Sequence, residues 1–579
     1  MDPYHRRLVA HPRTSVKNLT VPHGQKSVGM PRRFARRLPL VVGLSVSVLL
    51  WTVLRVHYGA FILPAFLFSV EDYDQPKLGI VDMAQEASPS SAGIDRPQWE
   101  PGVCNVPEIE FLRRPQLGLT NNIMYTRRCI KPAQSKAVRR SITDMGQPLI
   151  TNKMAVNLTD CSGIQLPPCE YISLPVPAVY PERRYEHLLF GVASTYERLN
   201  ASLPDFSHWL SSTGAPLLGI VADADDRNKV NLNLTALEAE YRTRNILATF
   251  IAPTIKTRIN RADQQGEGPA PVEQHHFLLV RELAALITPG VTRWLAIVDD
   301  DTFFPSLHPL DAELSRHDHT QSTWLGALSD SFSSVRSWGY MAYGGAGVFL
   351  SPPLASAIAP HAEQCMREAT ISTGDGILRD CIYTHTRTTL TLIQGLYQHD
   401  FRGDPSGFFE SGIQPLSLHH WKSWYKAPVA AISRVATLVC GDCLLQRFRF
   451  GSDTLLANGY SIAVYKPGVL ATLPLERVEG TWAYATEDYD PTYGRLRPKV
   501  DSAEKKSYLL RDSVLEEGKR RPLDVGSGSS SGSGSGSKSS SGGAHKVFRQ
   551  LYVYRTGEDA WEQQFPTGVD EVVELYWEL

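Results

Sequence analysis

The sequence predicts an α/β fold with a doubly wound, mostly parallel sheet in residues 181–425. Short apolar runs that end in small or acidic residues, as buried parallel strands do, are the first indication. The second is a helical spacing of apolar residues in VEQHHFLLVRELAALI, 272–287, followed directly by another apolar run. Strand and helix therefore alternate, which is typical of an open parallel sheet. The candidate strands are HLLFGVAS at 187–194, PLLGIVAD at 216–223, LATFIAP at 247–253 and RWLAIV at 293–298.

The N-terminus predicts a membrane anchor. Residues 1–37 carry nine Lys or Arg against one acid, and Leu38–Leu54 has no charge over 17 residues. A helix of this length, extended to residue 60, can cross a bilayer. A cleaved signal peptide is the alternative, but its charged region is usually short. The positive-inside rule then predicts a cytosolic tail at 1–37, a transmembrane helix at 38–60 and a lumenal remainder, which is a single-pass type II topology.

The cysteines and the charge balance agree with a lumenal protein that binds no nucleic acid. All eight cysteines follow the anchor, an even number suited to disulfides. Sequons occur at Asn157, Asn200 and Asn233. With 59 Lys and Arg against 60 Asp and Glu, the chain has no global field for a polyanion. The CGDC at 440–443 indicates a local structural disulfide rather than a redox pair, because no thioredoxin-like pattern surrounds it.

Outside the α/β region the composition and the residue pattern of the sequence change. Residues 61–180 are Pro-rich with four cysteines, which predicts a stem and an irregular, disulfide-tied lead-in. Residues 426–523 predict a β-rich unit, with SRVATLVC at 433–440 as one of its strands. The Gly/Ser tract predicts a disordered loop at 524–545. Residues 546–579 hold two strands that we expect to pair back onto the β-rich unit.

An acidic triplet follows the last of the candidate strands, in RWLAIVDDDTFFPS. Asp299, Asp300 and Asp301 fall at the carboxyl end of a strand, where open α/β sheets collect ligands. Adjacent carboxylates repel each other unless a cation neutralises them. Oxygen ligands favour Mg²⁺ or Mn²⁺, and such a site holds a nucleotide diphosphate. An exposed acidic turn and a Ca²⁺ loop are the alternatives, although the flanking LAIV and FF tie the acids to the core.

Two later stretches fit the same site. WGYMAYGGAGVFLS contains Gly344, Gly345 and Gly347, which permit close approach of a ligand or an unusual backbone angle, with a tight hairpin as the alternative. PLSLHHW, at 415–421, ends a short apolar run with His419 and His420. Because side chains alternate along a strand, only one of these imidazoles can reach the metal.

Four motifs together resemble a known family. VDDDTFF, GGAGVFLS, GDGILRDCIY and LSLHHW occur in that order between Val298 and Trp421. This order is similar to that of the Fringe-type and core-1-galactosyltransferase-type β1,3-glycosyltransferases, glycosyltransferase family 31, and closest to their fungal Fringe-related branch. The resemblance covers roughly residues 185–425.

The resemblance implies a GT-A fold, a UDP-sugar donor, Mn²⁺ (with Mg²⁺ as a substitute), inversion at the anomeric carbon and a place in the Golgi or ER membrane. It makes Asp299 and Asp301 the D-x-D pair, with Asp300 beside the nucleotide. Asp301 is the direct metal ligand, and His419 completes the coordination, with His420 as the alternative.

The GDG motif supplies one acid, whereas related enzymes often show two adjacent acids. The resemblance makes this acid, Asp375, the general base that deprotonates the acceptor hydroxyl. Its place ahead of ILRDCIY also fits a helix cap, and that alternative stays open.

Further site residues follow from the resemblance. Thr195 and Asp223, after the first two strands, would lie on the uridine side of the donor. Trp324, Trp338 and Tyr343 would frame the sugars, with core packing as the alternative for each.

The expected function is transfer of a hexose or N-acetylhexosamine from a UDP-sugar to a hydroxyl of a glycan or glycoprotein, with a β1,3 linkage. The alternative is a membrane-tethered relative that binds glycans without catalysis. A thiol oxidoreductase using CGDC is a third hypothesis, which an inert Cys440–Cys443 disulfide would exclude.

Overall fold

The computed structural model describes residues 107–135, 142–160, 164, 166, 169–224, 232–255, 257–259, 269–485, 489–517, 546–557 and 568–579. All of them belong to one unit of the chain, Ser88–Leu579. The basic tail at 1–37, the anchor at 38–60 and the Gly/Ser loop at 524–545 lie outside the described residues. Within the described ranges, no helix combines the length and the apolar character needed to cross a bilayer.

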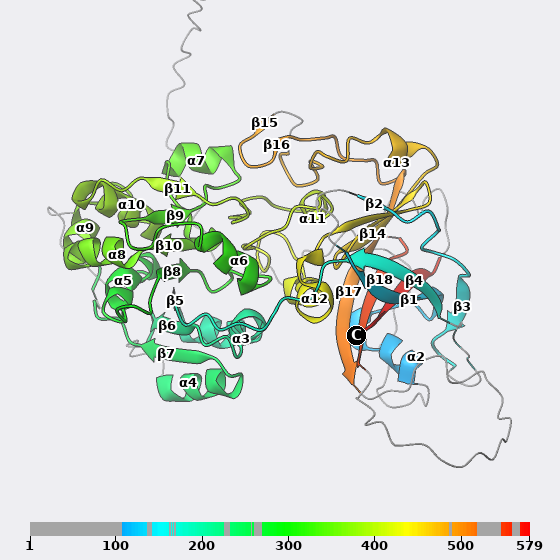
Figure 1. Ribbon diagram of the computed structural model, residues 1–579, viewed down its shortest axis with the longest axis horizontal. Coiled ribbons are helices and arrows are strands. Elements are labelled where there is room, and N and C mark those ends of the chain that lie inside the picture. The colour runs from blue at the N-terminus through cyan, green and yellow to red at the C-terminus, as the bar shows by residue number, and fades with distance from the viewer. Residues whose placement is uncertain are drawn as a thin grey trace, which may run out of the picture. The chain divides into compact units, whose positions relative to one another are not determined.

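A seven-stranded sheet carries the mixed α/β part of the structure (Figure 1). Its strand order is β11-β9-β10-β8-β5-β6-β7. β10 is antiparallel to both of its neighbours, and the other pairings are parallel. The strands are β5 (Leu188–Ser194), β6 (Pro216–Val221), β7 (Leu247–Ile251), β8 (Trp294–Val298), β9 (Trp324–Gly326), β10 (Val348–Leu350) and β11 (Leu390–Leu392).

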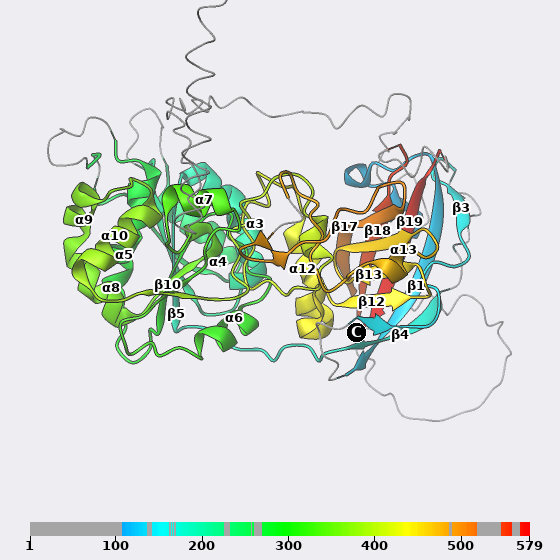
Figure 2. The same ribbon diagram turned by 90° about the horizontal axis from the view of Figure 1, so that it is seen from above.

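Helices cover both faces of this sheet, which Figures 1 and 2 show from two sides. Alternate residues of β5 point to opposite faces: Leu188 and Phe190 pack in the core with α3 (Tyr196–Leu210), and Leu189 packs in the core with α5 (Val272–Ala284). The inner strands β5, β6, β8 and β10 are therefore buried on both faces, which explains why they are apolar, whereas the edge strands β7 and β11 are partly exposed. The remaining helices are α2 (Pro107–Leu112), α4 (Leu234–Thr243), α6 (Leu307–Leu314), α7 (Phe332–Trp338), α8 (Pro352–Ile358), α9 (Ala362–Glu368), α10 (Gly374–His385), α11 (Ser406–Phe409), α12 (Val429–Val435) and α13 (Val469–Thr472).

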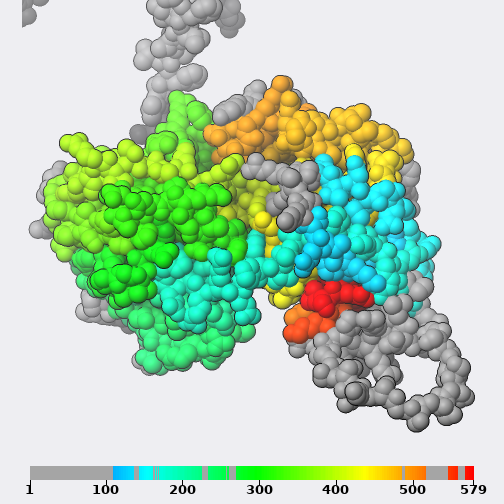
Figure 3. All heavy atoms as spheres, viewed as in Figure 1, coloured from blue at the N-terminus to red at the C-terminus, as the bar shows by residue number. Residues whose placement is uncertain are grey.

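A ten-stranded sheet unites the start and the end of the described chain. β18 pairs antiparallel with β17 and β19, and β1 pairs parallel with β19. Figure 3 shows the C-terminal strands in red beside the blue and cyan N-terminal ones. The strands are β1 (Asn122–Gln134), β2 (Thr143–Asp144), β3 (Met154–Asn157), β4 (Glu170–Val176), β12 (Arg447–Phe450), β13 (Thr454–Ala457), β14 (Ser461–Tyr465), β17 (Lys505–Glu517), β18 (Lys546–Tyr554) and β19 (Asp570–Glu578); β15 (Tyr489–Asp490) and β16 (Gly494–Arg495) pair separately.

The structure corrects the expectation of an irregular lead-in before residue 180. Four strands lie in that segment, and β1 is a long inner strand of the second sheet. Its charged residues concealed it, because Arg127 and Arg128 break the apolar pattern although both are buried. Arg127 forms an ion pair with Glu574 of β19, and the Arg128 Nε donates to the carbonyl of Leu149 at 2.7 Å.

The strand expected at 433–440 is also wrong. This segment continues α12 into a π-helical turn, η4 (Ala436–Cys440). Its β-branched residues favour a strand locally. Packing overrides that preference, because Ile432, Val435 and Val439 lie on one side of the helical segment and enter the hydrophobic core.

Three disulfides are present among the described residues, and none of the described cysteines is free. Cys129–Cys169 joins β1 to β4, and Cys365–Cys381 joins α9 to α10. Cys440 and Cys443 bond to each other and are fully buried. A redox dithiol needs an accessible thiolate. The thiol oxidoreductase hypothesis is therefore excluded.

Glu574 lies at the centre of a buried charge cluster in the ten-stranded sheet. Its side chain is fully buried between the guanidinium groups of Arg127 and Arg549, at 3.7 Å from Arg127 Nε and 2.7 Å from Arg549 Nε. We predict that Glu574→Leu lowers the free energy of unfolding by about 3–5 kcal/mol, because two arginines lose their buried counter-charge.

Urea unfolding monitored by tryptophan fluorescence measures this effect. Glu313→Leu is the control, since the Arg316 side chain that pairs with Glu313 is 71% exposed and the pair is worth about 1 kcal/mol or less. Equal unfolding midpoints for the two variants would contradict the prediction.

Candidate functional site

The acidic triplet begins where β8 ends, and two sets of hydrogen bonds fix its position. The backbone N–H of Asp299 donates to Thr302 Oγ1 at 2.9 Å, and that hydroxyl donates to the carbonyl of Gly345 at 3.0 Å. Phe303 and Leu418 exchange two backbone hydrogen bonds of 2.8 Å. The segment that carries the His pair is therefore held beside the triplet.

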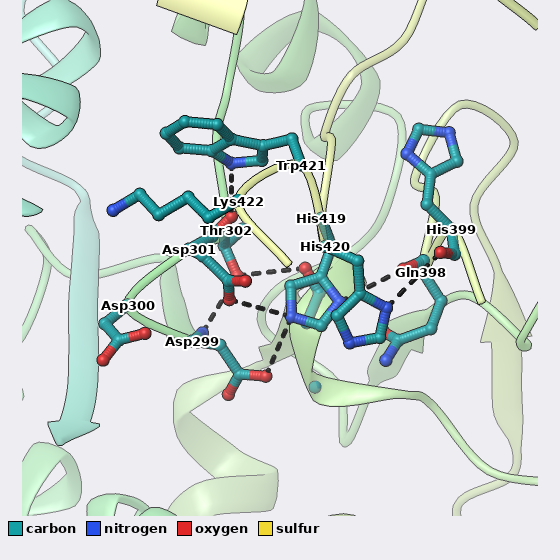
Figure 4. Close-up of polar contacts among 12 residues, drawn as sticks. Asp299, Asp300, Asp301, Thr302, Gln398, His399, His419, His420, Trp421 and Lys422 are labelled. Atoms are coloured by element: carbon teal, nitrogen blue, oxygen red, sulfur yellow. Dashed lines mark hydrogen bonds and ion pairs between the residues drawn. The ribbon is translucent and has the colours of Figure 1, made fainter. Parts of the chain in front are cut away.

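Asp299, Asp301 and His419 converge on one point (Figure 4). The His419 Nε2 lies 3.0 Å from Asp301 Oδ1 and 3.3 Å from Asp299 Oδ2. One ligand atom from each residue lies within 4.8 Å of the others. The His419 Nδ1 faces the carbonyl of Gln398 at 3.1 Å, which orients the ring as an outer partner orients a metal-binding imidazole.

Mutual charge stabilisation dominates the electrostatics of this group. Burial disfavours the charged ring of His419, but the carboxylates of Asp301 and Asp299 outweigh it and raise the pKa of His419 well above its usual range. Burial likewise raises the pKa of Asp299, but the neighbouring imidazoles hold this pKa well below its usual range. The pKa of Asp301 is lowered in the same way, against burial, chiefly by His419. The surroundings thus favour a positive charge beside these carboxylates, which a bound cation would also supply.

His420 faces away from this group, as Figure 4 shows. Its Nδ1 lies 3.3 Å from the carbonyl of His399 and 3.3 Å from Asp400 Oδ1. The backbone of His420 is left-handed, with φ of 57°, and its ring stacks on Trp424. Of the two adjacent imidazoles, the structure places His419 with the carboxylates.

Asp300 is turned to the other side of the triplet (Figure 4). It accepts hydrogen bonds from the hydroxyl of Ser194, the last residue of β5, and from the guanidinium of Arg198 in the first turn of α3. Each carboxylate of the triplet therefore has a cation or a strong donor of its own, and Asp300 takes no part in the three-residue group.

A second imidazole reaches the triplet from α5. The His276 Nε2 lies 3.2 Å from Asp299 Oδ1. Burial opposes its charge, but Asp299 and Asp375 raise the pKa of His276. Sequence reasoning missed this residue, because the helical pattern of 272–287 was defined by its apolar positions. The only local signal was a His near the start of the helix that precedes β8 and the acidic triplet.

Asp375 lies in the first turn of α10 but is not its cap. Thr373 caps this helix by accepting from the N–H of Gly376 at 3.2 Å. The Asp375 Oδ2 instead accepts from the N–H of Gly344 at 3.0 Å, and its Oδ1 is buried without a hydrogen-bond partner among the described residues. Burial, reinforced by the Asp299 charge, raises the pKa of Asp375 to about 6. A carboxylate with one held and one free oxygen suits a proton acceptor.

Two of the three glycines serve the site by leaving room for side chains. A Cβ on Gly345 would lie 2.1 Å from the His419 ring, and one on Gly344 would lie 2.7 Å from Asp375 Oδ1. Gly347 has φ of 94°, which favours glycine. The close approach that we expected for a ligand is made instead by His419 and Asp375.

The uridine-side and sugar-side residues fall in different places. Thr195 caps α3, and the Asp223 carboxylate accepts from the N–H of Tyr196 at 2.8 Å, so the two lie together beside β5. Trp324 and Tyr343 are buried in the core, which corrects their expected role as sugar platforms. Both rings belong to the same hydrophobic cluster as residues of α8 and α10. Trp338, at the end of α7, is 39% exposed.

A cavity of about 600 Å³ opens over the triplet. Asp299, Asp300, Asp301 and His419 line it, together with two cations that sequence reasoning missed, Arg198 and Lys422. Carboxylates that bind a cation, with basic side chains beside them, can hold a diphosphate.

Comparisons with known proteins give limited matches. A family described as "Protein of unknown function, DUF604" matches residues 334–435, a segment that contains the glycine turn, Asp375 and both histidines but not the triplet. No curated protein matches.

Among solved structures, the chain is similar to an active-site mutant of LgtC, with 10% identity over 42% of this chain and 83% of that one and a TM-score of 0.25. It is similar to mouse xyloside xylosyltransferase 1 in its apo form, with 12% identity over 36% and 84% and a TM-score of 0.24. The apo bifunctional glycosyltransferase WbbM gives 9% identity over 39% and 43%, with a TM-score of 0.24.

Proposed function

We propose that this protein is an inverting glycosyltransferase with a GT-A fold that moves a hexose or N-acetylhexosamine from a UDP-sugar to a hydroxyl of a glycan or glycoprotein. One observation carries the proposal: the convergence of Asp299, Asp301 and His419 at the carboxyl end of β8, with the free Oδ1 of Asp375 close by. The resemblance of the four motifs to family 31 supports the β1,3 linkage. It also supports a single-pass type II protein of the Golgi membrane.

The three converging residues fit a divalent cation. Two carboxylate oxygens and one imidazole nitrogen suit Mn²⁺, and also Mg²⁺. In this role Asp301 and His419 would be direct ligands, and Asp299 would complete the D-x-D pair. When bound, the cation would offset the negative charge that grows on the departing UDP. Arg198 and Lys422, on the wall of the same cavity, would add positive charge for the diphosphate.

Asp375 would act on the acceptor. Its Oδ1 takes the proton of the acceptor hydroxyl while the N–H of Gly344 holds Oδ2 and fixes the orientation of the carboxylate. The acceptor oxygen bonds to the anomeric carbon on the face opposite the phosphate, and the bond from that carbon to the UDP oxygen breaks. His276, between Asp299 and Asp375, would keep the two carboxylates from repelling each other.

The metal role predicts the effect of removing one ligand. Asp301→Ala should weaken Mn²⁺-dependent UDP binding by about 100-fold or more, because a ligand is lost rather than a supporting contact. Titration calorimetry with UDP, with and without Mn²⁺, measures this. The exposed turn residue Asp318→Ala is the control, with unchanged affinity. Equal UDP affinity in wild type and Asp301→Ala would refute the metal role.

The base role predicts a separation of turnover from binding. Asp375→Asn keeps the hydrogen bond from Gly344 but cannot take a proton, so kcat should fall by about 10²–10⁴-fold while UDP affinity is kept. Asp380→Asn, on the same helix, is the matched control. Full turnover in Asp375→Asn would overturn the assignment, and a wild type that binds glycans but never UDP would favour the glycan-binding alternative.

The raised pKa of Asp375 predicts a pH dependence. Because this carboxyl titrates at about 6, its basic form is lost as the pH falls through that value, and kcat should fall with it. A bound cation close by favours the carboxylate, so the acid limb should lie at or below about pH 6. The pH profile of kcat at saturating Mn²⁺ and donor tests this. A limb centred above about pH 7 is the contrary outcome.

A further inference from the structure

A second cavity lies next to the first and plays no part in the mechanism above. Its volume is about 470 Å³, within the range of roughly 300–1,000 Å³ that is usual for small-molecule sites. Its walls come mainly from three distant segments, namely the start of α7, residues 400–402 and residues 482–485, with Trp424 and the stretch around Asp490 completing them. Residues 482–485 belong to the C-terminal part of the chain, and the N–H of Ala483 anchors them by donating to the carbonyl of Arg402 at 2.8 Å.

Aromatic side chains on these walls are exposed to solvent. Tyr484 is 98% exposed and Phe332 is 67% exposed, which is unusual for large rings lining a cavity. Tyr484 also has φ of 65°, a left-handed backbone that is rare for an aromatic residue and often marks a functional position. Trp482 is held in place by stacking on the buried Phe401 ring, with 5.0 Å between the ring centroids. Flat, exposed rings of this kind are the surfaces on which sugar rings stack.

The charged groups of the cavity are mainly acidic. Asp330, Asp400 and Asp490 line it, against the single guanidinium of Arg402. Asp400 and Asp490, with only the Arg402 guanidinium against them, disfavour a sulfated, phosphorylated or sialylated ligand. Burial, reinforced by Asp400 and Asp490, raises the pKa of Asp330 to about 7. The Asp330 Oδ2 accepts from the N–H of His399 and its Oδ1 is buried, so Asp330 adds to the polarity of the wall rather than to ligand contacts.

The second cavity adjoins the candidate active site. Trp424 lines both cavities. Rings in contact connect the group of Asp299, Asp301 and His419 to Trp424. The ring centroids of His419 and His420 lie 3.8 Å apart, and the His420 ring stacks on the Trp424 ring with 4.0 Å between their centroids.

We propose that this second cavity is the acceptor subsite and that it binds a neutral saccharide, with Phe332 and Tyr484 as the stacking platforms and acidic side chains as hydroxyl partners. The role as acceptor subsite rests on the proposed function. The binding of a neutral saccharide by these residues does not, and it is measured separately.

The first experiment measures binding to the full-length chain without donor or metal, by saturation-transfer NMR and titration calorimetry. The probes are methyl glycosides of galactose, glucose, mannose and N-acetylglucosamine, with disaccharides of each; a sialylated trisaccharide is the charged arm. At least one neutral probe should bind, and Phe332→Ala and Tyr484→Asn should each weaken it about tenfold. Asparagine is chosen because it tolerates a left-handed backbone.

Tyr383→Ala is the matched control, since this ring is 45% exposed and lines neither cavity. Its binding should equal that of wild type. The inference is overturned if no neutral glycoside binds, if a charged probe binds in preference, or if both aromatic variants bind as wild type does.

A second measurement separates this inference from the proposed function. Mn²⁺-dependent UDP binding and donor hydrolysis should be unchanged in Phe332→Ala and Tyr484→Asn, while transfer to the bound glycoside should show an acceptor KM raised about tenfold. Saccharide binding without any donor hydrolysis in wild type would refute the transferase and leave a glycan site. Hydrolysis with an unchanged acceptor KM in both variants would refute the subsite alone.

Discussion

Three carboxylates are crowded at the end of a buried strand, and the need to neutralise their charge constrains the rest of this site. Asp299, Asp300 and Asp301 follow β8 without a break, and such charges coexist only if positive groups surround them. The structure supplies those groups from three elements: His419 from the segment before α12, His276 from α5 and Arg198 from α3. The packing of these elements around β8 therefore also serves to neutralise the triplet.

Close approach of these groups depends on small residues. His419 lies against Gly345 and Asp375 lies against Gly344, at distances that leave no room for a Cβ. The antiparallel strand β10 places this glycine turn beside the end of β8. The same arrangement holds one Asp375 oxygen on a backbone N–H and leaves the other free. Backbone geometry thus prepares a proton acceptor a short distance from a cation site.

The fold was predictable where periodicity is local. The apolar runs at 187–194 and 293–298 correspond to β5 and β8, since strands buried on both faces remain apolar throughout. Prediction failed where a pattern depended on distant partners. β1 looked irregular because its arginines pair with Glu574 and Glu170, and 433–440 looked like a strand because core packing, rather than propensity, makes it helical.

For the site, the sequence alone determined which residue types meet the end of β8: a run of acids, a glycine turn, one later Asp and a His pair. Only the tertiary structure decided that His419 rather than His420 faces the acids, that His276 joins them, and that Trp324 is core. It alone assembled the second cavity from segments around residues 332, 401 and 484. The physical reason is that sequence periodicity records which side of an element is buried. The distance between side chains on different elements is fixed by how the whole core packs.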